Sequence, residues 1–308
     1  MNDQAEKPKR RRKRPERFAD LHVHTNFSDG TFSPTDIVKF AAAARLKAVA
    51  ITDHDTIDGI PEALAQGTRS RIEVIPGIEI AALHAGGAMD ILGYYIDIAS
   101  PSLESRLRWL REVRDERNPR IIARLRDLGL ELDYEEVLRI AEGATVGRPH
   151  IARVLVAKGY VRNVPEAFDR YLGRNAPAYV PKERLTSAQV IEVIREAGGV
   201  PVLAHPDTLG AASEEALDLL LARLVREGLR GIETICSGYD ARAIASLTRL
   251  AEKHNILMTG GSDFHGDVKP GVSVGTGPGD LRVPYRFAES LRAAARGLRE
   301  RVLQAAPG

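Results

Sequence analysis

Short apolar runs alternate with helical stretches along most of this chain, and this alternation limits the possible folds more than any other feature. The runs are rich in β-branched residues and predict strands at 18–24, 48–52, 72–75, 89–94, 200–204, 231–235 and 256–260, with a further candidate at 272–275. Helices are predicted between them, at 34–46, 60–70, 187–198, 213–228, 240–254 and 284–304. Because repeated strand–helix order favours parallel strands, the sequence predicts an α/β fold, either a barrel or a doubly wound sheet.

The region 101–184 breaks this rhythm, because it contains arginine-rich helical patterns and few strand signals. Its segments read RLRWLREVRDERNPRIIARLRDLGL, YEEVLRIAEG, RPHIARVLVAKGY and VPEAFDRYL. A chain of 308 residues is long enough for one large α/β domain with an all-α insertion. The predicted organisation is a tail at 1–17, a first part of the α/β body at 18–100, the helical insertion at 101–184 and a second part of the body at 185–308.

The first 17 residues, MNDQAEKPKRRRKRPER, form a strongly basic tail. They contain eight Lys or Arg residues against three acidic ones, although the whole chain has a formal net charge of only +2. With almost no apolar residues this segment cannot bury a core, so we expect it to be disordered. It could bind RNA or another polyanion, and the alternative is a solvated tail without a partner.

The rest of the sequence carries no sign of export or membrane insertion. It has no apolar segment typical of a secretory signal and no run long enough to span a membrane, so we expect a cytoplasmic protein. The single cysteine, Cys236, excludes an intramolecular disulfide and a cysteine-rich zinc site.

Ionisable residues recur at one structural position, the ends of the predicted strands. The set comprises His22, His24, Asp29, Asp53, His54, Glu79, Asp90, His205, Asp263 and His265, and so includes five of the eight histidines. In parallel α/β proteins the carboxyl ends of the strands meet at one edge, so most of these side chains are expected to lie together. Each alone has an ordinary explanation, such as a helix-capping role for Asp53, but their joint occurrence points to a metal site.

The first of these positions shows the pattern most clearly, in LHVHTNFSDG at 21–30. A strand repeats every two residues, so His22 and His24 face one side while the apolar residues beside them face the other. The carboxylate of Asp29 follows in the turn beyond this strand. Two imidazoles on one face with a carboxylate nearby are what a metal site requires.

The ligand types restrict the metal. Imidazoles and carboxylates without a thiolate suit Mn²⁺, Fe²⁺ or Zn²⁺ and disfavour a structural zinc site. The candidates are too numerous for one tetrahedral ion, so two or three divalent ions are expected. Clustered ions serve hydrolysis, and phosphate esters are their natural substrates.

Five motifs, LHVHTNFSDG, ITDHD, PGIE, AHP and SDFH, occur in this order between residues 18 and 275. This arrangement resembles the polymerase and histidinol phosphatase (PHP) family of metal-dependent phosphoesterases. The resemblance implies a distorted (β/α)₇ barrel, with Mn²⁺ as the expected metal. The insertion motifs RNPRI and GRPHIARVLV resemble one branch of small stand-alone enzymes. That branch includes nucleoside 3′,5′-bisphosphate phosphatases, some of which also trim RNA from its 5′ end.

The family pattern also implies how the ligands are divided among the ions. One ion would be held by His22, His24, Glu79 and Asp263, a second by Asp29, His54 and His265, and a third by Glu79, Asp90 and His205. At the position of Asp90 relatives often carry a histidine. A carboxylate can still bind a metal, so the third site would either survive with an altered preference or be empty. In the second case His205 would stay near the phosphate as a hydrogen-bonding or proton-donating group.

Two residues of the GRPH motif, Arg148 and His150, are candidates for contact with the substrate phosphate. A guanidinium suits bidentate phosphate contact, and the resemblance supports this role. The alternative for Arg148 is a surface residue at a helix start, since a proline follows it. Arg114, Arg117 and Arg120 could bind a second phosphate or an RNA backbone, but a solvated helix face explains them better.

The leading hypothesis is a phosphoesterase in which a metal-bridging hydroxide attacks phosphorus in line. The metals, held in part by Asp263, and Arg148 would absorb charge, while His205 or a metal-bound water would protonate the leaving alcohol. The expected substrates are nucleoside 3′,5′-bisphosphates and short 5′-phosphorylated RNA. Histidinol-phosphate phosphatase is an alternative, although the helical insertion argues against it. An alternative of another class is a non-catalytic PHP-like module that binds nucleic acid or a partner, but such modules usually have broken ligand sets.

Overall fold

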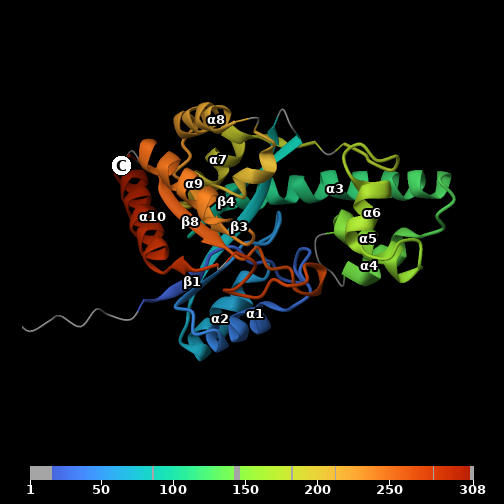
Figure 1. Ribbon diagram of the computed structural model, residues 1–308, viewed down its shortest axis with the longest axis horizontal. Helices are drawn as coiled ribbons and strands as arrows, with labels where there is room; N and C mark the ends of the chain where they lie inside the picture. Colours follow the sequence, from blue (N-terminus) through green and yellow to red (C-terminus); the bar gives the residue numbers. More distant parts are fainter. Residues whose placement is uncertain are drawn as a thin grey trace, which may run out of the picture.

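The structure is a computed structural model that describes residues 16–84, 87–141, 146–181, 183–211, 213–279 and 281–305. Most of the predicted basic tail, residues 1–15, lies outside this part of the chain. Arg17, which we assigned to the tail, belongs to the folded body, because its carbonyl accepts the Tyr285 N–H at 2.8 Å. Figure 1 shows an α/β body with a helical extension on one side.

One sheet forms the centre of the body. Its longer strands are β1 (Phe18–Asp20), β2 (Ala48–Ile51), β3 (Glu73–His84), β4 (Gly87–Tyr94), β6 (Val200–Leu203), β7 (Gly231–Cys236) and β8 (Leu257–Gly261), and its short ones are β5 (Leu185–Thr186) and β9 (Val283–Pro284). The order is β8-β7-β6-β4-β3-β2-β1-β9, with β5 paired to β3. Two further hydrogen bonds join the residues after β1 to β8 and the residues after it. The Leu21 N–H donates to Gly260 O at 3.1 Å, and the Asp263 N–H donates to His22 O at 2.9 Å. The sheet therefore curls into a nearly closed barrel, which confirms the predicted fold class.

The expectation of parallel strands is wrong for β4. This strand pairs antiparallel with both β3 and β6, whereas the pairs β1–β2, β2–β3, β6–β7 and β7–β8 are parallel. The physical reason is the length of the connection, because β3 runs on to His84 and β4 starts at Gly87. A parallel neighbour needs a crossover of about a dozen residues, so two strands joined this closely must form a hairpin.

Other differences concern short elements. The candidate strand at 272–275 is wrong, since the structure has only an isolated bridge between Ser273 and Thr276 there. Gly271 and Gly275 both adopt positive φ angles of 85° and 77°, which turn the chain instead of extending it. The two-residue strands β5 and β9 were not predicted, because so short a pairing leaves no periodic pattern in the sequence.

Helices pack around the barrel at the positions that the sequence predicts. They are α1 (Pro34–Ala43), α2 (Ile60–Ser70), α7 (Ser187–Glu196), α8 (Glu214–Glu227), α9 (Ala241–Lys253) and α10 (Arg286–Ala305). In β2, Val49 and Ile51 belong to the apolar cluster shared with α1 and α2, while Ala48 and Ala50 belong to a second cluster that α10 joins. This alternation gives the barrel two apolar layers. None of the helices in the described ranges is long and apolar enough to cross a membrane.

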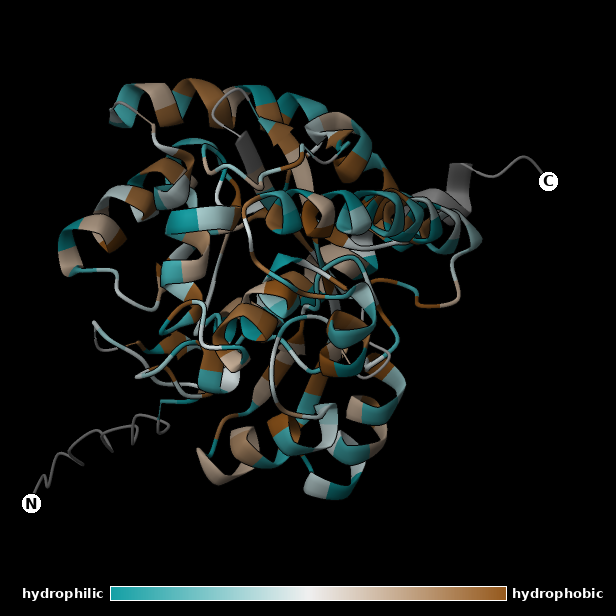
Figure 2. Cartoon of the chain, turned by 90° about the vertical axis from the view of Figure 1, so that its right-hand side faces the viewer, coloured by the Kyte–Doolittle hydropathy of each residue, from teal (hydrophilic) through white to brown (hydrophobic). Residues whose placement is uncertain are grey.

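In the described part of residues 101–184, all regular secondary structure is helical. It contains α3 (Pro101–Asp127), α4 (Tyr134–Ala141), α5 (Arg148–Ala157), α6 (Val164–Ala167) and the π-helical turn η1 (Phe168–Leu172). The first half of α3 packs Leu103 and Leu107 into the barrel cluster, whereas its second half packs Ile121 and Leu125 into a separate cluster formed with the other insertion helices. Figure 1 shows α3 running out from the barrel with α4, α5 and α6 along its far half. In Figure 2, which looks onto this side, hydrophilic and hydrophobic residues alternate along the helices, as expected for helices that bury one face.

Candidate metal centre

His22 and His24 face the same side at the end of β1, as their spacing predicts. Both side chains are fully buried, and their Nε2 atoms lie 3.1 Å apart. Both nitrogens also approach Glu79 Oε2, at 3.3 and 3.1 Å, and Asp263 Oδ1, at 3.5 and 3.4 Å. The four residues that the family resemblance assigned to one ion therefore converge on one point.

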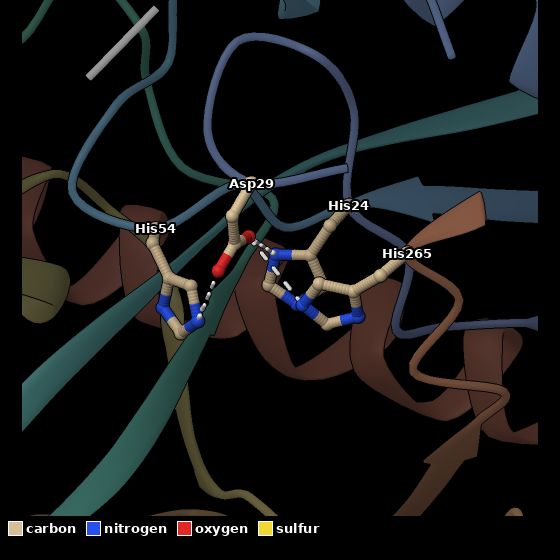
Figure 3. A group of neighbouring side chains, drawn as sticks. All are labelled: His24, Asp29, His54 and His265. Carbon is tan, nitrogen blue, oxygen red and sulfur yellow. Dashed lines mark ion pairs between the residues drawn. The ribbon is translucent and has the colours of Figure 1, made fainter. Parts of the chain in front are cut away.

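A second group forms around Asp29, as Figure 3 shows. Its carboxylate lies between His54 on one side and His24 and His265 on the other. Oδ1 is 3.6 Å from His24 Nδ1 and 3.4 Å from His265 Nε2, and Oδ2 is 3.9 Å from His54 Nε2. The atoms of this group lie within 4.8 Å of one another, so one ion could reach all four residues. His24 thus adjoins both groups, whereas the family pattern implied that it serves only the first.

A third group lies on the other side of Glu79. Glu79 Oε1 is 2.9 Å from His205 Nε2, and this nitrogen is 3.8 Å from Asp90 Oδ2. The nine predicted ligands therefore form one connected cluster. Whether each of them binds a metal stays a prediction.

The antiparallel hairpin explains how β3 and β4 both contribute to this cluster. Glu79 does not follow the third strand, as we predicted from the sequence, but lies in the middle of β3. Asp90 lies in the first half of β4 and pairs with Ala81 of β3. Because β4 runs antiparallel to β6, the first half of β4 lies beside the end of β6.

Two residues of the cluster hold backbone conformations that are rare for residues other than glycine. Asp263 has a φ of 54°, and His205 has a φ of 22° at the start of the 3₁₀ turn η2 (Pro206–Leu209). Such conformations cost on the order of 1–3 kcal/mol and persist only where surrounding contacts impose them. Their occurrence here supports a functional role for this end of the barrel.

The charges in the cluster compensate one another. Burial lowers the pKa of His24, but hydrogen bonds to Asp263 and Glu79 and the charge of Asp29 outweigh it and raise the pKa to about 10. Burial would raise the pKa values of Asp29 and Glu79, yet the neighbouring histidines hold both well below their usual range. Protonated imidazoles thus occupy a place where the carboxylates attract positive charge.

The donor set fits divalent metal ions. His24 Nδ1 is buried without a hydrogen-bond partner in the structure and points toward Asp29. Burying a polar atom without a partner is costly, so this nitrogen is better explained as a metal ligand than as part of a finished hydrogen-bond network. Imidazoles and carboxylates without a thiolate suit Mn²⁺, Fe²⁺ or Zn²⁺.

Asp53 is the member of the strand-end set that does not join these groups. Its Oδ1 accepts the Thr25 N–H at 2.7 Å and the Ser28 hydroxyl at 2.6 Å, and its Oδ2 accepts the Thr25 hydroxyl at 2.7 Å. It therefore holds the loop that carries Asp29. The helix-capping explanation is wrong for Asp53, because the N-cap of α2 is Gly59.

The GRPH motif lies beside the Asp29 group. His150 is 2% exposed, and its Nδ1 accepts the Gly147 N–H at 3.1 Å. Burial lowers its pKa to about 4, even though the charge of Asp29 acts in the opposite direction. His150 is therefore neutral at pH 7 and carries its proton on Nε2.

Four guanidiniums gather near this motif, in what we call the arginine cluster: Arg114, Arg117, Arg148 and Arg184. Burial, together with the charges of Arg148 and Arg114, lowers the pKa of Arg117 to about 9. Arg117 is 6% exposed, and its Nη2 has no hydrogen-bond partner in the structure. The expectation of a solvated helix face is therefore wrong for Arg117 and for Arg114, whose Nε donates to Asp55 at 3.0 Å. Arg120 is exposed, as expected.

Arg148 is partly buried, and contacts within the insertion hold its side chain. Its Nη1 donates to Leu172 O at 2.9 Å, and its guanidinium lies 5.4 Å from the ring centroid of Phe168 and 5.6 Å from that of Tyr179. Burial lowers its pKa. A role in phosphate binding stays a prediction for this residue.

Sequence reasoning missed three side chains that surround the cluster. Glu233 of β7 lies 3.1 Å from His22 Nδ1, Lys269 donates to Asp263 Oδ2 at 2.5 Å, and Asp55 binds Arg114. Glu233 interrupts the apolar strand GIETIC, which was the one available signal. A cavity of about 240 Å³, lined in part by His205, Asp263, Lys269 and Tyr239, opens beside the cluster.

The barrel and its cluster define a class, that of α/β-barrel metal hydrolases with ligands at the strand ends. The PHP domain model matches residues 20–173. The chain is 36% identical over 248 residues to the 5′-3′ exoribonuclease Rnm of Salmonella typhimurium, covering 80% of this chain and 84% of that protein. It is 31% identical over 257 residues to the 3′,5′-nucleoside bisphosphate phosphatase of Chromobacterium violaceum, covering 83% and 90%.

A solved structure agrees with these relatives. The crystal structure of a Bifidobacterium adolescentis protein, described as a metal-dependent phosphoesterase, matches with a TM-score of 0.80 at 30% identity, over 92% of this chain and 98% of that chain. The chain belongs to the PHP family. It is a metal-dependent phosphoester hydrolase.

Proposed function

We propose that this enzyme removes the 3′-phosphate from nucleoside 3′,5′-bisphosphates and also acts on short 5′-phosphorylated RNA. The observation that carries this proposal is the arginine cluster beside the metal centre. Arg114 joins the two regions, because its partner Asp55 directly follows the candidate ligand His54. A substrate with one phosphate at the barrel and another at the insertion would use both regions.

The nine clustered residues are the proposed ligands of two or three Mn²⁺ ions. When bound, such ions would polarise the phosphoryl oxygens and lower the pKa of a coordinated water. The protein supplies the orientation, because the ligands come from β3, β4 and the loops after β1, β2, β6 and β8. Asp263 gives one oxygen to the cluster and the other to Lys269, which fixes the rotation of its carboxylate.

When the group of Glu79, Asp90 and His205 holds no ion, His205 is the proposed proton donor to the leaving alcohol. Burial lowers its pKa, but the hydrogen bond to Glu79 and the charge of this carboxylate raise it to about 9, so the ring is protonated at pH 7. Its side chain is 19% exposed and lines the cavity beside the cluster, so a substrate oxygen can approach it. A protonated, partly exposed imidazole is suited to general acid catalysis.

The insertion is the proposed holder of the second phosphate. Arg117 and Arg148 offer positive charge, and the neutral His150 offers an Nε2–H donor without adding charge. Burying several guanidiniums together is unfavourable without an anion, so a bound phosphate would relieve their repulsion.

The two alternative functions fit these observations less well. Histidinol phosphate has one phosphate and a positively charged amine, which the arginine cluster would repel. A non-catalytic module would have no need of nine converging ligands and a protonated histidine at an open cavity.

The test is phosphate release by Mn²⁺-loaded protein from adenosine 3′,5′-bisphosphate, adenosine 3′-monophosphate, histidinol phosphate and a 5′-phosphorylated RNA oligomer. We expect the bisphosphate to be the best small substrate, and His22→Ala to abolish its turnover. Turnover of histidinol phosphate alone would show that the proposed substrate is wrong. If the metal-loaded protein released phosphate from none of the four compounds, a non-catalytic binding module would be favoured.

A further inference from the structure

Glu233 is a buried carboxylate to which neither the family motifs nor the proposed mechanism gives a role. It lies on β7 between Ile232 and Thr234, and its side chain is 0% exposed. A carboxylate is costly to bury unless both of its oxygens are bonded. Here both oxygens are bonded, and their partners belong to the cluster.

The two oxygens of Glu233 serve residues from two different strands. Oε1 lies 3.1 Å from His22 Nδ1, at the end of β1. Oε2 accepts the backbone N–H of His205 at 2.8 Å, just after β6. The buried carboxylates of Asp20 and Asp53 differ, because they accept hydrogen bonds from backbone N–H groups and from Ser or Thr hydroxyls.

The first bond decides which nitrogen of His22 faces the cluster. When Nδ1 donates its proton to Glu233, Nε2 keeps a free lone pair, and Nε2 is the atom that points toward Glu79, His24 and Asp263. A carboxylate behind a metal-binding imidazole fixes its tautomer and its orientation in this way.

The second bond is donated by His205, a residue with a strained backbone. His205 has φ 22° and ψ 65°, and its ring must reach Glu79 from that conformation. Its N–H has Glu233 as its partner, so this carboxylate anchors the residue that we propose as proton donor.

We propose that Glu233 is a positioning residue that sets the tautomer of His22 and the backbone of His205 with a single carboxylate. The inference rests on the proposed metal ligands. It predicts that Glu233 influences metal affinity without touching metal or substrate.

The substitution Glu233→Gln tests this directly. A carboxylate can accept both hydrogen bonds, whereas a carboxamide has one acceptor oxygen and must turn its NH₂ group toward either His22 or the His205 N–H. We expect Mn²⁺ binding to the His22 group, measured by calorimetric titration, to weaken roughly 10–100-fold. The Asp29 group should keep its affinity, so the titration should separate into one changed and one unchanged class of site.

A matched control is Glu73→Gln. Glu73 is also a carboxylate with both oxygens bonded, to Tyr95 and Tyr285, but it stands at the beginning of β3, away from the cluster. This variant should bind Mn²⁺ like the unaltered protein. Equal metal affinity of Glu233→Gln and the unaltered protein would overturn the proposal, and failure of the unaltered protein to bind metal would overturn the proposed function with it.

A second measurement does not depend on the folding of Glu233→Gln. Zn²⁺-loaded protein labelled with ¹⁵N-histidine should give an Nδ1–H signal for His22, assigned by its loss in His22→Gln, with Nε2 shifted by the metal. A His22 signal with Nε2 protonated or with the metal on Nδ1 would contradict the role of Glu233, while leaving the proposed substrate untouched.

Discussion

The barrel end and the insertion meet at the contact between Asp55 and Arg114 but carry opposite chemistry. The barrel cluster combines imidazoles with Glu79, Asp29 and Asp263, whose pKa values lie well below their usual range, so it attracts cations. The insertion gathers four guanidiniums. Within the described ranges, one of them, that of Arg114, binds the carboxylate of Asp55, which belongs to the barrel. The difference suggests that one region carries out the reaction and the other selects the substrate.

The two regions also differ in how they are built. The ligands of the barrel lie on or next to hydrogen-bonded strands, which fixes their relative positions. The insertion has its own apolar cluster, and α3 is the element that packs into both. Substitutions in one region should therefore leave the other intact, and this separation can be tested.

The largest effect should follow from His24→Ala. His24 adjoins two of the ligand groups, so its loss should disturb both. Metal ions contribute several kcal/mol to such reactions, so phosphate release from every substrate should fall by on the order of 10³-fold. If the His24→Ala variant kept its activity and its metal content, the assignment of the reaction to the barrel cluster would be wrong.

A smaller and more selective effect is expected for Arg117→Met. Hydrogen bonds to charged groups contribute about 1.5–3 kcal/mol, so kcat/KM for adenosine 3′,5′-bisphosphate should fall roughly 10–100-fold, mainly through KM. The same variant should hydrolyse adenosine 3′-monophosphate normally. Arg120→Met on the exposed face of α3 is the matched control, and equal losses in the two variants would refute a specific phosphate site.

The pH dependence of stability should have opposite signs in the two regions of the metal-free protein. The pKa of His24 is raised to about 10, so its contribution is complete below pH 6.5 and is lost as the pH rises toward 10. The pKa of His150 is lowered to about 4, so the unfolded chain takes up a proton first and stability falls as the pH drops from 6.5 to 4.

Urea unfolding between pH 4 and 10, in the presence of a chelator, measures both contributions. His24→Gln should make the alkaline decline shallower, and His150→Gln should do the same for the acid decline. An unchanged profile in either variant would show that its histidine does not titrate as the structure implies.

The smallest effect concerns the basic tail. Removal of residues 2–15 should raise KM for a 5′-phosphorylated RNA a few-fold at low salt, and the difference should shrink as salt increases. Hydrolysis of the bisphosphate should not change, because this substrate is too short to reach beyond the site. If the full chain and the shortened chain had equal RNA kinetics at low salt, the tail would have no part in binding.

The strand–helix order predicted an α/β body, and the family resemblance implied that it is a barrel. The cluster of histidines and carboxylates could be predicted because it depends on local patterns. The period of two places His22 and His24 on one face, and the strand–helix order brings the strand ends together. The direction of β4 depends instead on the short connection after His84, which an apolar run does not reveal. The inward position of Arg117 depends on how α3 packs, since an arginine-rich helix looks solvated until its neighbours are known. Glu233 was missed because its partners are distant in sequence.

The most direct measurement is a crystal structure of the protein with Mn²⁺, adenosine 5′-monophosphate and orthophosphate, the proposed products. The account predicts anomalous manganese peaks within the His22 and Asp29 groups, orthophosphate on the metals, and the 5′-phosphate against Arg117 and Arg148. Manganese elsewhere, or a nucleotide phosphate that leaves the arginine cluster empty, would contradict it.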